Sequence, residues 1–205
     1  MSACRSSRRL SGRSRTALPA AGAALASLLL LSACGSGTSG GGSQTNFVQG
    51  KDGIATVPAA DRKPAPELSG PTTRGKHLDV SAYRGKVIVL NVWGSWCSPC
   101  NAEAANLDKV ARDTKAKGVQ FVGINTRDDD KAQAVSFEQR HKVGYPSLFD
   151  PTGKLLLRFS KGELNPDGIP STLVIDRKGR LAARYMGPLT EEDLRKMVDP
   201  LIAEK

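Results

Sequence analysis

One stretch constrains the fold more than any other: two cysteines, two residues apart, at the junction of a strand and a helix. Residues 87–93 (Val-Ile-Val-Leu-Asn-Val-Trp) have the composition of a buried strand, Gly94-Ser95 ends that pattern, and residues 101–114 have helical composition. Cys97 and Cys100 therefore lie where the strand gives way to the helix. Unpaired backbone N–H groups and the helix dipole stabilise a thiolate at such a helix N-terminus.

This position predicts different roles for the two sulfur atoms. The pKa of a cysteine at a helix N-terminus falls from about 8.5 to about 3.5–7.5, so we expect Cys97 to be the attacking thiol. Cys100 follows about one helical turn later, close enough to form a disulfide with Cys97, and we expect it to be the more buried, resolving thiol. So small a ring adds little stability under the loop-entropy model, which favours a redox role over a structural one.

The beginning of the chain has the pattern of a secretory leader. Residues 1–16 contain five arginines and no acidic residue, and residues 17–31 are small and apolar. The sequence Leu-Ser-Ala-Cys at 31–34 resembles the bacterial lipoprotein processing site, which implies that Cys34 is lipidated and becomes the first residue of the mature protein. A single transmembrane anchor is the alternative, but about 15 apolar residues are fewer than the ~20 that a spanning helix needs.

We therefore expect three regions along the chain. Residues 1–33 are the signal peptide, residues 34–61 are a lipidated and flexible tether because of their many small residues, and residues 62–203 are the folded domain. In the exported protein Cys97 and Cys100 are then the only free thiols, which suits redox chemistry in an oxidising compartment.

The charge pattern excludes one class of partner. Removing residues 1–33 takes away five arginines and no acid, so the formal net charge of +10 becomes about +5 on 172 residues. The chain has no basic cluster interleaved with aromatic residues, so we do not expect it to bind nucleic acid. The charged run at residues 127–131 is interpreted as the solvated start of a helix.

The order of the expected elements predicts an α/β fold. Strands and helices alternate, a hairpin follows, and a helix ends the chain, which gives a mixed central sheet with helices on both faces. The expected elements after the second cysteine are a strand at 119–125, a helix at 130–141, a strand at 169–176, a second hairpin strand at 181–186 and a last helix from about Thr190, as N-cap, to Ala203.

Three stretches resemble one known family, the thioredoxin-fold proteins, and within it the TlpA/ResA-like extracytoplasmic thiol-disulfide oxidoreductases. They are Leu90 to Cys100 with its Trp-Cys-Ser-Pro-Cys motif, the insert at 130–159, and Gly168 to Asp176 with its Ile-Pro dipeptide. Together they lie within residues 62–203. The resemblance implies a thioredoxin-like mixed central sheet with a TlpA/ResA-type insert.

The resemblance also implies a substrate-binding surface. It implies that Ile169-Pro170 is a cis peptide facing the disulfide, which leaves the backbone of Ile169 able to pair with an extended substrate. An ordinary trans proline at the start of a strand is the alternative. Trp96 and Pro99 are implied to lie on the same surface, with Trp96 as a lid beside the disulfide and Trp93 in the core.

The resemblance further implies a proton acceptor. Asn91 occupies the place where thioredoxins carry a buried Asp, and the family's carboxylate is a Glu three residues after the second cysteine, which is Glu103. Glu103 is three residues after Cys100, so both side chains lie on one face of the helix. A partly desolvated carboxylate there can act as the base for the resolving thiol. An acid stabilised by the helix dipole is the alternative. Ala105 replaces a proline common in the family, which leaves the geometry of Glu103 open.

The leading hypothesis is a membrane-tethered thiol-disulfide oxidoreductase that acts through Cys97 and Cys100. The resemblance implies a reductant, anchored by Cys34 on the outer face of the cytoplasmic membrane, that receives electrons from a membrane protein of the CcdA type. It implies reduction of apocytochrome c or other exported disulfide-containing proteins. We expect a monomer without a cofactor.

Two other functions use the same cysteines. A thiol peroxidase of the peroxiredoxin-related group normally carries Thr or Ser three residues before its attacking cysteine, and Gly94 stands at that place here. A metal carrier, for example for copper, is the second alternative. Zinc and iron–sulfur sites usually take four ligands, and only the distant His77 and His141 are available as further imidazoles, so no metal is expected.

Overall fold

The computed structural model describes residues 45–204, which form a seven-stranded mixed sheet with a separate two-stranded hairpin. The order in the large sheet is β1-β2-β9-β8-β5-β6-β7, and the hairpin pairs β3 with β4. Its strands are β1 (Val48–Gln49), β2 (Ala55–Thr56), β3 (Ser69–Pro71), β4 (His77–Asp79), β5 (Val87–Trp93), β6 (Val119–Thr126), β7 (Ser147–Asp150), β8 (Ser171–Ile175) and β9 (Leu181–Met186). The helices are α1 (Ser98–Lys115), α2 (Lys131–Arg140), α3 (Glu191–Ala203) and the 3₁₀ helices η1 (Val80–Tyr83) and η2 (Leu156–Arg158).

Strand β5 lies at the centre because all seven of its residues are buried. It pairs in parallel with β6 and antiparallel with β8, so that Asn91 lies opposite Gly123 on one side and Thr172 on the other. Its carboxyl end leads directly into the turn that carries the two cysteines. The central strand thus places the Cys-x-x-Cys motif at one end of the sheet.

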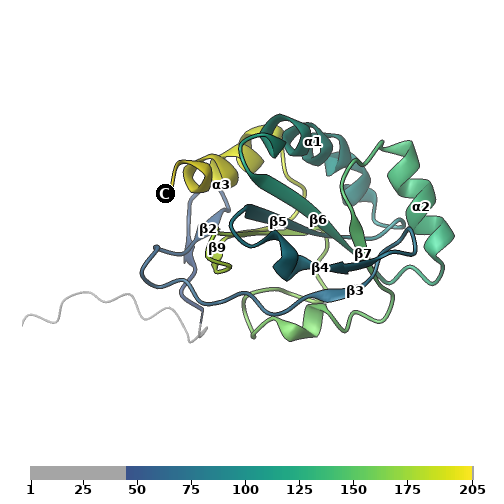
Figure 1. Ribbon diagram of the computed structural model, residues 1–205, viewed down its shortest axis with the longest axis horizontal. Coiled ribbons are helices and arrows are strands. Elements are labelled where there is room, and N and C mark those ends of the chain that lie inside the picture. Colours follow the sequence, from purple (N-terminus) through teal and green to yellow (C-terminus); the bar gives the residue numbers. More distant parts are fainter. Residues whose placement is uncertain (1–44, 205) are drawn as a thin grey trace, which may run out of the picture. The chain divides into compact units, whose positions relative to one another are not determined.

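Two layers cover the sheet. Alternate β5 residues Val87 and Val89 pack in one cluster with apolar side chains of α1 and α3, which lie together above the sheet in Figure 1. Ile88 and Leu90 face the opposite cluster, which the β3-β4 hairpin, η1 and η2 close. The expected mixed sheet with helices on both faces is confirmed, and the helices on the second face are short 3₁₀ helices.

Helix α1 begins three residues earlier than the composition indicated, and includes Ser98-Pro99-Cys100. Cys97 is its N-cap, with extended backbone and a side chain that accepts from the N–H of Cys100. Pro99 is tolerated in the first turn because the N–H groups there have no intrahelical acceptor. The helix continues without a break past Ala105, so the lack of a proline leaves it regular.

Two of the expected caps and turns are confirmed. The hydroxyl of Thr190 accepts from the N–H of Asp193 and so caps α3. The β8–β9 hairpin turns through Gly179 at φ 79°, a left-handed backbone conformation that glycine adopts without steric cost.

The expected extent of the tether was wrong. The signal peptide at residues 1–33, Cys34 and the first part of the tether lie outside the described residues, but residues 48–57 add β1 and β2 to the sheet. Ile54, Ala55 and Val57 are buried, and Ala55 pairs with Arg184 of β9. Burial of its apolar side chains against the edge of β9 orders this segment. The small and polar residues around it had led to the prediction of a flexible tether. Within residues 45–204 no helix has the length and apolar character needed to span a bilayer.

Candidate active site

The two cysteines of the motif form a disulfide at the N-terminus of α1. The Cys97–Cys100 bond has an S–S distance of 2.04 Å and joins Cα atoms 5.2 Å apart. The N–H of Cys100 points at the sulfur of Cys97 at 3.2 Å. Cys97 is only 3% exposed and Cys100 is buried. The helix terminus therefore directs a donor at the sulfur that we expect to attack, as the sequence indicated.

The peptide between Ile169 and Pro170 is cis, as the resemblance implied. Ile169 packs against the cluster that contains Cys97 and Cys100, so this peptide lies beside the disulfide. The carbonyl of Pro170 accepts from the N–H of Gly187 at 2.9 Å, which ties the loop to the end of β9. Among residues 45–204 no hydrogen bond engages the backbone of Ile169, so its polar groups are available to an extended ligand.

Trp96 lies on the surface next to the disulfide, and Trp93 lies in the core. The Trp96 side chain is half exposed, and its Nε1 donates to the carbonyl of Arg127 at 3.1 Å. The Arg127 guanidinium lies over the same indole, 5.1 Å from the ring centroid. Trp93 stacks on Phe137 of α2 with ring centroids 4.4 Å apart. Both tryptophans therefore lie where the sequence predicted.

Gly94 allows the indole of Trp96 to fold back over the turn. A Cβ atom at Gly94 would lie 2.7 Å from Trp96 Nε1 and 3.2 Å from the carbonyl of Thr126, closer than van der Waals contact allows. The Thr or Ser that thiol peroxidases carry at this position would therefore collide with Trp96. The absence of a side chain at Gly94 therefore leaves the space that the Trp96 indole occupies beside the disulfide.

The turn is held by a buried carboxylate that the sequence did not reveal. Asp128 accepts from the N–H of Ser95 at 3.0 Å, from its hydroxyl at 2.6 Å and from Nδ2 of Asn125 at 2.5 Å. The interpretation of residues 127–131 as a solvated helix start was thus wrong for Asp128, although Asp130 caps α2. Its position just after a parallel strand was the available signal, because polar groups at that edge of a sheet meet at functional sites.

Glu103 is buried one turn after Cys100 on the same helix. It is 1% exposed, and its two carboxylate oxygens accept from Asn91 Nδ2 at 2.8 Å and from the N–H of Leu189 at 2.9 Å. Burial raises the pKa of Glu103 to about 7, while these two hydrogen bonds act in the opposite direction. Asn91 also donates to Thr172, which fixes its amide. A solvated acid at the first helical turn does not fit this environment.

A small cavity is lined by Cys100 together with residues of β5, α1 and α2. Its volume is about 10 Å³, which is the size of a single water site, and Asn91 and Tyr145 contribute its polar lining. Burial and the nearby charges of Glu103 and Glu138 raise the pKa of the Tyr145 hydroxyl, so it remains protonated. Sequence reasoning missed Tyr145, since a single tyrosine before a short strand carries no local signal.

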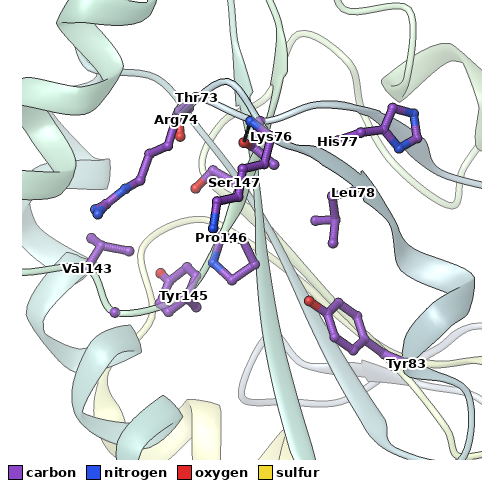
Figure 2. A pocket seen from close by; sticks show the side chains of 12 residues that line it. Thr73, Arg74, Lys76, His77, Leu78, Tyr83, Val143, Tyr145, Pro146 and Ser147 are labelled. Atoms are coloured by element: carbon purple, nitrogen blue, oxygen red, sulfur yellow. Dashed lines mark hydrogen bonds between the residues drawn. The ribbon is translucent and has the colours of Figure 1, made fainter.

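A second pocket of about 410 Å³ lies behind Tyr145 and Val143, which line both spaces. Figure 2 shows the side chains of Lys76 and Tyr83 pointing into this pocket, while His77 points away. Neither cysteine lines it, so it is separate from the disulfide. No group of three or more His, Cys, Asp or Glu side chains suited to a metal occurs in the part of the chain that the structure describes.

Comparison with known proteins agrees with this geometry. A family model described as Redoxin matches residues 59–201. The chain is 33% identical over 151 residues to the thiol:disulfide interchange protein HelX of Rhodobacter capsulatus, which covers 73% of this chain and 80% of that protein. It is 28% identical over 157 residues to the thiol-disulfide oxidoreductase ResA of Geobacillus kaustophilus, with 77% and 84% covered.

Solved structures show the same fold. The crystal structure of a DsbF homologue from Corynebacterium diphtheriae matches with a TM-score of 0.68 at 32% identity, and the match covers 74% of this chain and 95% of that one. The fold, the disulfide at the helix terminus and these relatives agree with one another. The chain belongs to the Redoxin family and is a TlpA/ResA-like thiol-disulfide oxidoreductase with a thioredoxin fold.

Proposed function

We propose that the protein is a membrane-tethered reductant of exported disulfide-containing polypeptides, with apocytochrome c as a candidate substrate. The observation that carries the proposal is the buried Glu103, whose pKa of about 7 suits it to accept a proton at neutral pH. It lies on the helix that carries both cysteines, one turn after Cys100. The disulfide thus has a built-in base on the side of the resolving thiol.

The reaction begins from the reduced dithiol. The Cys97 thiolate attacks one sulfur of the substrate disulfide, a new bond forms between Cys97 and that sulfur, and the other substrate sulfur leaves as a thiolate and takes up a proton. Cys100 then passes its proton toward Glu103 and attacks Cys97. This step closes the Cys97–Cys100 disulfide and releases the second substrate thiol, so two electrons move from the protein to the substrate.

The substrate-binding surface consists of Trp96, Pro99, Ile169 and Pro170. The unpaired backbone of Ile169 supplies a donor and an acceptor for an extended substrate segment, in the manner of an added strand. The half-exposed indole of Trp96 supplies apolar contact on the other side of the disulfide. Such contacts recognise backbone and shape, which suits a reductant that acts on unfolded chains.

The tether gives the reaction its location. The leader and the lipoprotein-like motif at 31–34 support lipidation of Cys34 and an exported domain held at the outer face of the cytoplasmic membrane. A membrane protein of the CcdA type would return electrons to the oxidised pair. We propose that the domain acts as a monomer and without a cofactor.

Trapping of the mixed disulfide tests this function. A Cys100→Ser variant of the full chain, expressed in its natural envelope, should accumulate exported proteins bound through Cys97. The Cys97→Ser and Cys100→Ser double variant is the matched control and should accumulate none. If the single variant traps nothing while Cys97 still reacts with iodoacetamide, exchange with exported proteins is refuted.

A further inference from the structure

A large groove lies beside the loop that carries the cis-proline. Its volume is about 1080 Å³, and its lining includes Leu157, Phe159, Lys161, Pro166, Arg184 and Met186. This volume exceeds the roughly 300–1,000 Å³ of a small-molecule site. Its size and lining are suited to a segment of polypeptide.

One wall of the groove continues into the cis-proline loop. Met186, at the end of β9, lies opposite Ser171, the residue after Pro170. The Ser171 hydroxyl donates to the sulfur of Met186 at 3.4 Å, and the next residue, Gly187, donates its N–H to the carbonyl of Pro170. A substrate segment that pairs with the cis-proline loop therefore meets Met186 next.

The opposite rim connects to the tryptophan lid. Pro166 lines the groove, and its carbonyl accepts from the Arg127 guanidinium at 3.4 Å. The same guanidinium lies over the indole of Trp96. An unbroken series of contacts thus leads from Trp96, across Arg127, to the groove.

Exposed apolar side chains gather along this series. Four large apolar side chains of residues 45–204 are exposed, and three of them are Trp96 at 53%, Leu157 at 70% and Met186 at 42%. The fourth, Val48, does not line the groove. Apolar patches rimmed by polar groups mark protein-binding surfaces, and methionine adapts to varied partners.

The charged side chains that line the groove are all cationic. Lys63, Lys161 and Arg184 line it and no lining residue is acidic. The carboxylate of the neighbouring Glu163 is buried and accepts from the N–H of Ser160, and its charge offsets part of the charge of Arg184. Arg184 donates to the carbonyls of Gly162 and Glu163, so its charge is fixed in place. The positive field favours an acidic partner and disfavours a basic one.

We propose that this groove binds the segment of the substrate polypeptide next to its disulfide cysteine, and selects a segment with an apolar side chain and a carboxylate. The apolar side chain packs on Leu157 and Met186, and the carboxylate faces Lys161. The proposal rests on the proposed function, because it extends the contact surface of the same exchange reaction. It names the class of substrate: an extended, acidic and apolar stretch of chain.

Single-turnover exchange with blocked peptides tests the groove. Each peptide carries one cysteine as a mixed disulfide with thionitrobenzoate, whose release as the coloured thiolate reports attack by Cys97 of the reduced full chain. Three kinds of peptide are compared, in which the residues next to the cysteine are Leu and Glu, Leu and Lys, or only Ser. Each kind is made in two forms, with these residues before or after the cysteine. The small mixed disulfide of glutathione and thionitrobenzoate is the reference.

The expected result is attack on the best Leu-Glu peptide about tenfold faster than on the Ser peptide, equivalent to ~1.4 kcal/mol. Leu157→Ser should remove this advantage, and Lys161→Glu should reduce the preference for the Glu peptide over the Lys peptide. The control variants Val48→Ser and Lys117→Glu, at exposed sites outside the groove, should change neither.

The outcomes separate the two proposals. Equal rates for all peptides, or a preference that Leu157→Ser and Lys161→Glu leave unchanged, would overturn the groove while exchange itself stands. A reduced chain that attacks neither the peptides nor the glutathione reference would overturn the proposed function and the groove with it.

Discussion

Replacement of Glu103 by Gln should make the stability of the oxidised protein less dependent on pH. In the folded protein burial raises the pKa of this carboxyl from its ordinary 4.5 to about 7. Between these two values the native state holds a proton that the unfolded chain has already released. The stability that Glu103 contributes is therefore fully present below pH 4.5 and is lost as pH rises through 7.

The magnitude follows from the shift. Each pKa unit corresponds to about 1.36 kcal/mol, so ionisation of Glu103 should cost the folded protein about 3 kcal/mol between pH 4 and pH 8. Gln cannot ionise, but its amide accepts from only one of the two donors, Asn91 Nδ2 and the N–H of Leu189. This loss lowers the stability of the variant by roughly 1–3 kcal/mol at every pH.

Urea unfolding of the oxidised chain at several pH values measures both effects. The difference between wild type and Glu103→Gln should shift in favour of the variant by about 3 kcal/mol from pH 4 to pH 8. Glu67→Gln, at an exposed carboxyl, is the matched control and should show no such trend. Parallel stability curves for wild type and Glu103→Gln would refute the reasoning, because they would mean that Glu103 ionises normally in the folded protein.

Three further substitutions test the surroundings of the disulfide. Asn91→Ala removes a hydrogen bond that lowers the pKa of Glu103, so the carboxyl should titrate at still higher pH by ¹³C NMR; an unchanged midpoint would contradict the bond. Asp128→Ala removes the acceptor of three hydrogen bonds and should cost about 2–3 kcal/mol in urea unfolding, and a loss below about 0.5 kcal/mol would contradict its bracing role. Gly94→Ala places a Cβ 2.7 Å from Trp96 Nε1, so the indole must move and its fluorescence should change, whereas an unchanged spectrum would show that the turn has room.

The strand, the cysteines and the helix were predictable because their signals are local. Six apolar residues among the seven at 87–93 and a Gly-Ser break indicate a strand that ends, and the composition after Cys100 indicates a helix. The cis peptide before Pro170 and the position of Glu103 could be expected only through the family resemblance. Neither proline isomerism nor burial of an acid is visible in a local pattern.

The rest of the site depends on contacts between distant segments. Asp128 is one acid in a charged run, and only the fold brings it to Ser95, 33 residues earlier. The strands at 48–49 and 55–56 have two residues each, too short for any periodicity to show. Their place in the sheet depends on the edge that β9 offers. The role of Asp128 and the two short strands depend on tertiary contacts, so the local sequence does not predict them.

The arrangement of Asn91 and Glu103 has a consequence for chemistry. The amide on β5 is neutral and donates to the carboxylate, so the carboxylate one turn after the resolving cysteine comes from the helix and not from the strand. A charged acid on β5 would place two carboxylates together and raise the pKa of one of them further. With Asn at this position, burial raises the pKa of Glu103 to about 7 without a second carboxylate beside it.

The reduction potential of the Cys97–Cys100 pair tests the central claim most directly. Strong oxidants stabilise their reduced thiolate. Here both sulfurs are buried, and the buried acid Glu103 lies one turn after Cys100, which opposes the stabilisation that the helix N-terminus gives to a Cys97 thiolate. Equilibration of the full chain with glutathione or thioredoxin should therefore give a potential closer to about −270 mV, as in thioredoxin, than to about −120 mV, as in DsbA. A value near −120 mV would contradict the assignment as a reductant.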